Sequence, residues 1–360
     1  MNELQKDILN VIQGRFPVER RPFGCLARQL GVGEVEVIDQ VRRLKGEGVI
    51  RYIGPVFDAG RLGYVSTLVA AAVAEEKVAG FVAEVNALEG VSHNYGRAHD
   101  YNIWFTLTMA SPEAIDDTIE RLKRRFGIEA IYSLPAVKRY KIKVDFDFGL
   151  AGDSTAEWAE AERFVDNSIS KDDATIADSI GEAQKALICE LQKDLPLVVE
   201  PFVQIAEGVN WEVEAVLDQI RYWKSSGLIR RFGARVRHER AGYTANGMVV
   251  FEVEPERVDE VGGILAGFNE VSHCYHRPAA PGWPYNMFAM THSRSQEELK
   301  RIADRMVEQA KPIQSNILLS VKEYKKSSVK YFLEENLTTK LSKDAKEEGE
   351  IRQDNRRKRI

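Results

Sequence analysis

Hydrophobic residues along the first 63 positions follow the spacing of helices. Leu4, Ile8 and Ile12 share one helix face, and the segment 23–50 predicts two more helices separated by a turn at 31–33. With the short strand expected at 50–53, this order is typical of a helix-turn-helix domain.

After position 63 the pattern changes to strands and helices in alternation. The sequence predicts a strand, a helix, two strands around a polar turn near His99-Asp100, a helix and a last strand. Their ranges are 64–74, 78–88, 91–109, 112–126 and 128–143. This β-α-β-β-α-β order is the ferredoxin-like arrangement, so we expect an α+β fold.

The second half of the chain repeats the first. Residues 48–64 align with 227–243 without gaps at an offset of 179, and His93 falls on His273 after one inserted residue. Both copies end in a Lys-x-Tyr pattern, at Tyr140 and at Tyr324. The second turn is expected at 208–210, with Asn210 as the N-cap of the following helix. We therefore expect two tandem copies of one unit.

This division predicts six segments. The two helix-turn-helix domains span 1–63 and 183–245, and the two ferredoxin-like αβ domains span 64–148 and 246–326. The acidic stretch 149–182, punctuated by Gly and Ser, is expected to be a linker. Residues 327–360 are expected to form a charged, solvated C-terminal tail.

Composition narrows the class of protein. The chain is 44% hydrophobic and 29% charged, as in ordinary globular proteins, and its net charge of -5 gives no general attraction to nucleic acid. No apolar run approaches the roughly 20 residues that span a bilayer, and the first residues lack a signal-peptide core. The 3 cysteines are scattered, so neither a disulfide framework nor a metal site is predicted. We expect a cytoplasmic protein without a membrane partner.

The layout of each unit resembles the Lrp/AsnC regulators, so a DNA-binding protein that senses an amino acid or haem is one interpretation. The charges argue against it, because a recognition helix needs basic or amide side chains near its start. Residues 34–47 and 211–224 each carry a net charge of -1, and their acidic residues crowd the first turns. Nucleic acid is therefore not the expected partner.

One heptapeptide pattern occurs twice, as VSHNYGR at 91–97 and VSHCYHR at 271–277. A strand puts alternate residues on one face, so His93, Tyr95 and Arg97 should lie together. His273, Tyr275 and Arg277 should do the same in the second half. These polar faces, where a buried sheet would carry Val or Leu, predict a site for an anionic ligand.

These motifs, with VIRYIGPVFD, LIRRFGARV and the Tyr-Asn that opens each following strand, resemble the siroheme decarboxylase family. The resemblance implies two related subunits fused in one chain and the removal of the C12 and C18 acetate carboxyl groups of siroheme. The product would be 12,18-didecarboxysiroheme, an intermediate of haem or haem d1 formation. No separate organic cofactor is implied, since the substrate carries the iron.

The residue types suit that reaction. A ring bearing eight carboxylates needs arginines and aromatic walls, and lost carbon dioxide must be replaced by a proton, which a histidine of pKa near 6.5 can donate. His93 and His273 are the candidate donors, with iron ligation or a structural role as alternatives; Tyr95 and Tyr275 are candidates to assist, or to pack. The candidate substrate-binding residues are Arg51, Arg97, Arg230, Arg231, His276, Arg277, Trp104 and Trp283.

The two halves are not equivalent in sequence. His99-Asp100 faces PGWP in the second half, and Gly96 faces His276. One half could hold the working site while the other supports it, and the stiff PAAPGWP segment, able to close over a flat ligand, favours the second. A haem carrier without turnover is a further alternative. A homodimer of fused chains is also expected, since Lrp-type sheets commonly dimerise.

Overall fold

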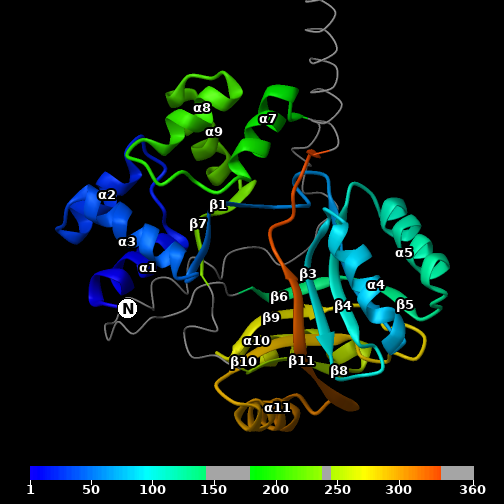
Figure 1. Ribbon diagram of the computed structural model, residues 1–360. Coiled ribbons are helices and arrows are strands. Elements are labelled where there is room, and N and C mark those ends of the chain that lie inside the picture. Colours follow the sequence, from blue (N-terminus) through cyan, green and yellow to red (C-terminus); the bar gives the residue numbers. More distant parts are fainter. Residues whose placement is uncertain (143–178, 237–244, 334–360) are drawn as a thin grey trace, which may run out of the picture.

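The structure, a computed structural model, describes residues 1–142, 179–236 and 245–333. The tandem arrangement is confirmed (Figure 1). The first unit consists of α1 (Glu3–Gly14), α2 (Pro22–Leu30), α3 (Glu34–Gly46), β1 (Ile50–Phe57), β2 (Val65–Ala71), α4 (Glu75–Ala87), β3 (Val91–Arg97), β4 (Ile103–Met109), α5 (Pro112–Phe126), β5 (Ile131–Pro135) and β6 (Lys138–Ile142). The second consists of α7 (Glu182–Leu191), α8 (Pro201–Val209), α9 (Val213–Ser225), β7 (Ile229–Val236), β8 (Ala245–Glu252), η3 (Pro255–Arg257), α10 (Val258–Gly267), β9 (Val271–His276), β10 (Met287–Ser293), α11 (Gln296–Ala310) and β11 (Gln314–Lys326).

Local sequence signals set many of the helix ends. Asn2 closes a capping box at the start of α1, and Ser111 caps α5 before Pro112. The prediction for Asn210 was wrong: it has φ 56° and ends α8, while Glu212 is the N-cap of α9. Asparagine tolerates the left-handed conformation, and Asn210 is the counterpart of Gly31, which ends α2 in the same way.

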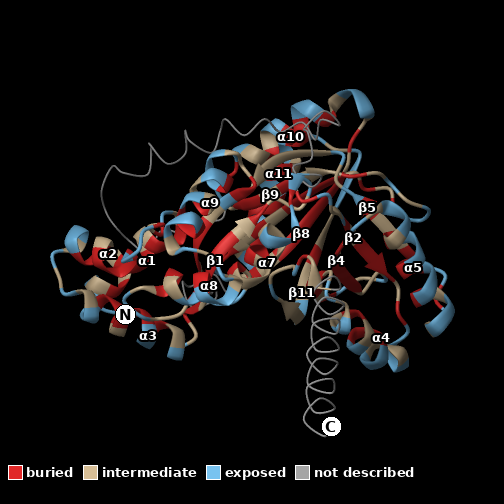
Figure 2. Ribbon diagram, turned by 90° about the horizontal axis from the view of Figure 1, so that it is seen from above, coloured by how far each residue is buried: buried red, intermediate tan, exposed pale blue. Residues whose placement is uncertain are grey.

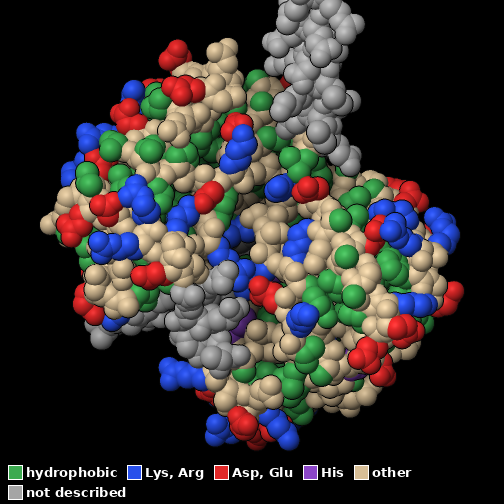
Figure 3. All heavy atoms as spheres, viewed as in Figure 1, with side chains coloured by type: hydrophobic (Ala, Val, Ile, Leu, Met, Phe, Trp, Pro, Cys, Tyr) green, Lys and Arg blue, Asp and Glu red, His purple; other side chains and the backbone are tan. Residues whose placement is uncertain are grey.

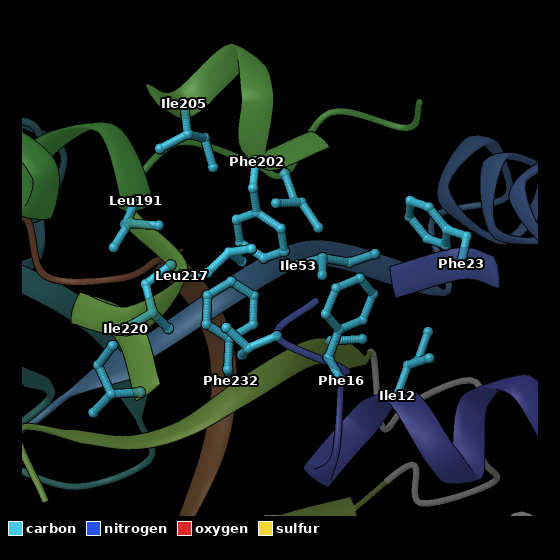
Figure 4. Close-up of a cluster of buried hydrophobic side chains, with 14 of the residues drawn as sticks. Ile12, Phe16, Phe23, Ile53, Leu191, Phe202, Ile205, Leu217, Ile220 and Phe232 are labelled. Carbon is cyan, nitrogen blue, oxygen red and sulfur yellow. The ribbon is translucent and has the colours of Figure 1, made fainter. Parts of the chain in front are cut away.

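The two helix-turn-helix domains share one core. Strands β1 and β7 pair antiparallel, with Gly54 opposite its own counterpart, Gly233. A pseudo-two-fold axis therefore passes between these glycines. Phe232 lies at the centre of the shared core, with ring centroids 5.9 Å from both Phe16 and Phe202 (Figure 4). Burial of aliphatic and aromatic side chains from both units makes this half a single packed body.

The two ferredoxin-like units form one nine-stranded sheet in the order β5-β2-β4-β3-β11-β8-β10-β9-β6. The expected last strand at 128–143 is divided: β5 pairs with β2 of its own unit, whereas β6 crosses to pair with β9 of the other unit. Strand β11 makes both kinds of pairing. Its start pairs with β8 of its own unit and its end pairs with β3 of the other unit. Each unit thus completes its neighbour's sheet.

In the part of the chain that the structure describes, the helices of the ferredoxin-like units lie on the outer face of the sheet. Helices α4 and α5 cover the first unit and α10 and α11 the second, each over its own apolar cluster (Figure 2). On the inner face Trp104, Leu134, Val250 and Phe288 bring both units into a further cluster. Among the described residues no helix is long and apolar enough to cross a membrane.

The segment after β11 is not a solvated tail from its first residue. Tyr331 is buried in the helix-turn-helix core, its backbone N–H and C=O both bonded to the side chain of Gln192. Phe332 donates its backbone N–H to the Tyr64 hydroxyl at 3.0 Å. Residues 327–332 therefore tie the sheet to the helical half, and the rest of the expected tail, with most of the expected linker, lies outside the described residues.

The crossing strand β6 predicts an unequal response of two neighbouring glycines in α10. A Cβ at Gly262 would lie 2.4 Å from the Tyr140 ring of β6, whereas one at Gly263 would meet nothing within 4 Å. Gly262→Ala should lower the free energy of unfolding by about 1–3 kcal/mol through overpacking. Gly263→Ala should leave it unchanged or raise it by up to about 1 kcal/mol. Urea denaturation of both variants measures this, and equal stabilities would contradict the crossing.

Candidate active site

The two heptapeptides place their polar side chains as predicted. On β3 the rings of His93 and Tyr95 stack with centroids 6.3 Å apart, and Arg97 lies 5.5 Å from the Tyr95 centroid. On β9 the His273 and Tyr275 rings also stack at 6.3 Å. Arg277 lies 4.7 Å from the Tyr275 centroid. Each set therefore shares one strand face, on the inner side of the sheet.

Both candidate histidines are held by a serine. Ser92 Oγ lies 2.8 Å from Nδ1 of His93, and Ser272 Oγ lies 2.9 Å from Nδ1 of His273. No described residue hydrogen-bonds Nε2 of either ring, so this nitrogen is available to a ligand. Ser272 Oγ also lies 2.8 Å from Nε2 of His292. His292 of β10 therefore shares this serine with His273.

The surroundings of both histidines favour neutral imidazoles. Burial lowers the pKa of His93 to about 3, and Lys326, Arg235 and His273 lower it further in the same direction. Burial, with a smaller contribution from Arg277, lowers the pKa of His273 to about 4. Burial at both positions thus favours a histidine pKa below the ordinary value. Substrate carboxylates beside the rings would raise both pKa values again.

The paired arginines are more enclosed than expected. Arg97 and Arg277 are 5% and 9% exposed. Arg97 Nη1 donates to Leu318 O at 2.9 Å and Ser320 Oγ at 2.7 Å, and Arg277 Nη1 donates to Leu134 O at 2.6 Å. Burial lowers the pKa of each guanidinium to about 10, so both stay charged at neutral pH. They brace the sheet in this structure, and contact with substrate stays a prediction.

The arginines of the wing strands β1 and β7 reach toward the same face. Arg51 pairs with Glu323 at 3.4 Å and donates to Lys326 O at 3.4 Å, which ties β1 to β11. Arg230 donates from Nε to Asp58 Oδ2 at 2.7 Å. Arg231 follows on β7, opposite Val56 of β1. The structure thus brings the first two into ion pairs near the sheet.

Other predicted residues lie apart from the histidines. The Trp104 and Trp283 rings are 5.0 Å apart and each residue is 1% exposed, so in this structure they pack the inner cluster and offer a ligand no surface. The PAAPGWP segment packs on the first unit, where Tyr101 donates to Pro281 O at 3.3 Å. His276 lies on the opposite face of β9 from His273, toward Asp259 of α10.

Several charged neighbours could not be found from the heptapeptides. Arg235 comes from β7, and Lys326 and Glu323 come from the end of β11. Arg139 comes from β6, opposite Tyr275. The repeated Lys-x-Tyr pattern marked these last strands, but only the strand crossing puts them beside the histidines. Figure 3 shows a hollow between the helical half and the sheet, with Lys and Arg side chains gathered in it.

Known proteins resemble this chain over both kinds of domain. A model described as the siroheme decarboxylase NirDL-like HTH domain matches residues 5–51 and 184–230. One described as the AsnC-like ligand binding domain matches 61–141 and 240–325. The siroheme decarboxylase of Hydrogenobacter thermophilus is 36% identical over 336 residues, 93% of this chain and 96% of that protein. This chain belongs to the siroheme decarboxylase family.

Further relatives fit the fused arrangement. The siroheme decarboxylase alpha subunit of Desulfovibrio desulfuricans is 47% identical over 146 residues, 41% of this chain and 84% of that subunit. The crystal structure of the siroheme decarboxylase NirDL in complex with an iron-uroporphyrin III analogue matches with a TM-score of 0.69 and 32% identity. It covers 92% of this chain and 96% of that one. The expected family and fold are thereby confirmed.

The half-buried histidines predict an acid-sensitive fold. The pKa of His93 is lowered to about 3 and those of His273 and His292 to about 4, whereas an unfolded histidine titrates near 6.5. Between these values only the unfolded chain binds the protons, so stability is complete above pH 6.5 and falls as the pH drops. At pH 5 each histidine should lower the free energy of unfolding by about 1–2 kcal/mol relative to its value above pH 6.5.

Urea denaturation of the ligand-free protein from pH 8 to pH 4.5 measures this effect. His93→Gln and His273→Gln should each flatten the dependence, and the double variant should flatten it more. A wild-type profile as flat as that of the double variant would show that these rings titrate normally.

Proposed function

We propose that this chain is a carboxy-lyase that removes the C12 and C18 acetate carboxyl groups of siroheme, giving 12,18-didecarboxysiroheme. The observation that carries the proposal is the pair of equivalent histidines on one inner face, each with Nδ1 held by a serine and with Nε2 not hydrogen-bonded by any residue that the structure describes. Family membership supplies the substrate class, because a relative's structure holds an iron-uroporphyrin III analogue.

For this reaction the protein must supply positive charge to bind the carboxylates and a proton to replace the lost carbon dioxide. Loss of carbon dioxide breaks the bond between the acetate methylene and its carboxylate and leaves the electron pair on the methylene carbon. A proton from His93 or His273 Nε2 then forms the methyl group, so each step consumes one proton and is redox-neutral. For that reason we expect no separate organic cofactor. The carboxylates themselves would raise the pKa of the histidines and so help to charge them.

Anaerobic incubation of the purified protein with siroheme, followed by mass spectrometry of the tetrapyrrole, tests the activity. The wild type should release two carbon dioxide units per ring without an added cofactor. His93→Ala and His273→Ala should each slow at least one decarboxylation about 10²–10⁴-fold, the contribution of a positioned acid. Added imidazole should restore part of the rate, which a purely structural role would not allow.

The outcomes separate the alternatives. Full activity in both single variants and in the double variant would exclude histidine as the proton donor. Loss of one carbon dioxide would assign the working site to one half. Siroheme bound but unchanged would favour a carrier or sensor.

A DNA-binding regulator is the second candidate, and the helix contacts disfavour it. Arg42 of α3 donates to Leu197 O at 3.3 Å, and Lys45 pairs with Asp194, both in the other unit. Arg221 of α9 donates to Val18 O at 3.0 Å. Basic residues of both recognition helices thus bind the other helix-turn-helix domain. They are therefore not available to contact a phosphate backbone, as DNA binding would require.

We therefore expect no retarded DNA in a gel-shift assay at 50 mM salt, with random duplexes or with the promoter region of this chain's own gene. A complex that weakens steeply with added salt would contradict this expectation and revive the regulator.

The remaining expectations concern the setting of the protein. The strand exchange between β6 and β9 and between β11 and β3 pairs the two units within one chain. A homodimer of fused chains would therefore use another surface, and we retain it, with a cytoplasmic location, as a proposal that sedimentation and fractionation would test.

A further inference from the structure

The crossing strands place residues of opposite charge at equivalent positions. On β6, Arg139 lies directly opposite Tyr275 of β9. On β11, Glu323 lies directly opposite Tyr95 of β3. These are the middle residues of the two Lys-x-Tyr patterns, and residues directly opposite in an antiparallel pair share a face. The two half-sites therefore have the same tyrosine and histidine but a reversed charge beside the tyrosine.

In the first half-site the carboxylate is already engaged. The Tyr95 hydroxyl donates to Glu323 Oε2 at 3.3 Å. Arg51 pairs with Glu323 Oε1 at 3.4 Å, and Lys326 lies 3.8 Å from Oε2. Glu323 thus occupies the place that a ligand carboxylate would take beside Tyr95, and its charge would repel one.

In the second half-site the charged residue beside the tyrosine is Arg139, which has no hydrogen-bond or ion-pair partner among the described residues. Arg230, the counterpart of Arg51, is bound to Asp58. Arg139 is half-buried next to this ion pair and Tyr275, and in the part of the chain that the structure describes no residue forms an ion pair or hydrogen bond with its guanidinium. A guanidinium in such a place suits bidentate binding of a carboxylate.

The two half-sites also differ in the residue that lies opposite each histidine. Lys326 lies opposite His93, whereas its counterpart Ile142 lies opposite His273. Among the residues of the crossing strands, the first half-site thus presents positive charge at the level of the histidine, and the second presents it at the level of the tyrosine. A ring with carboxylates around its rim would meet different charges if it were turned over about the pseudo-two-fold axis.

We propose that Arg139 and Glu323 fix the orientation of the tetrapyrrole in the site: Arg139 binds a carboxylate substituent beside Tyr275, and Glu323 excludes one from beside Tyr95. Which acetate meets which histidine first then follows from this pair. The proposal rests on the proposed function for its substrate, and it adds specificity-determining residues to the histidines.

Two measurements test it. Titration of the haem-type absorbance band of iron-uroporphyrin III reports binding without turnover: Arg139→Gln should weaken affinity about tenfold, while Glu323→Gln should leave it equal or tighten it. Partial anaerobic turnover of siroheme, with separation of the two monodecarboxylated regioisomers, reports orientation. The wild type should form one regioisomer first, and the charge exchange Arg139→Glu with Glu323→Arg should invert or mix that preference.

Lys138→Gln is the matched control, because it removes a positive charge one residue earlier on β6, from a side chain paired with Asp259 at 2.7 Å. It should change neither affinity nor regioisomer ratio. If the exchanged variant does not fold, Arg139→Gln alone should still lower the selectivity.

The outcomes distinguish this proposal from the proposed function. Turnover with an equal mixture of regioisomers in the wild type, or with an unchanged ratio in Arg139→Gln and in the exchanged variant, would overturn the orienting role and leave the decarboxylase intact. If siroheme is not decarboxylated at all, the function fails, and the binding titration alone decides: equal affinities of wild type and Arg139→Gln would then refute the carboxylate site.

Discussion

The exchange of final strands between the two ferredoxin-like units is the constraint on which the rest of this molecule depends. Strand β6 leaves its own unit to pair with β9, and the end of β11 leaves its unit to pair with β3. Each histidine strand is thereby covered by a strand from another part of the sheet. Without this pairing β3 and β9 would be open edges, and the charged residues of β6 and β11 would not reach the site.

The two helix-turn-helix domains are related by the same pseudo-two-fold symmetry as the two ferredoxin-like units. The pairing of β1 with β7 places Gly54 opposite Gly233 and carries Arg51 and Arg230 toward the sheet. Segment 327–332 then joins both halves, because Tyr331 is buried in the helical core directly after β11. The half that resembles a DNA-binding domain would form one wall of the proposed ligand site, and its own basic residues hold the two copies together.

Symmetry of fold is combined with asymmetry of charge. His93 and His273 have matching serine and tyrosine neighbours, so both halves have the groups that the proposed proton delivery requires. The cations differ, since Lys326 and Arg235 act on His93 while Arg277 acts on His273. A duplicated chain can change one half without the other, which a symmetric dimer of identical subunits cannot do. That freedom suits the proposed reaction, in which the two reacting acetates of siroheme are not equivalent.

The sequence by itself determined the two tandem units, the order of their helices and strands, and the faces of the histidine strands, because periodicity and capping are local properties. Family membership was also legible from the motifs. Tertiary structure alone decided that Arg139 and Glu323 stand beside Tyr275 and Tyr95, and that Trp104 and Trp283 are buried together. Strand partners distant in sequence are chosen by packing of the whole sheet, and the pKa of a histidine is set by atoms that this packing brings round it.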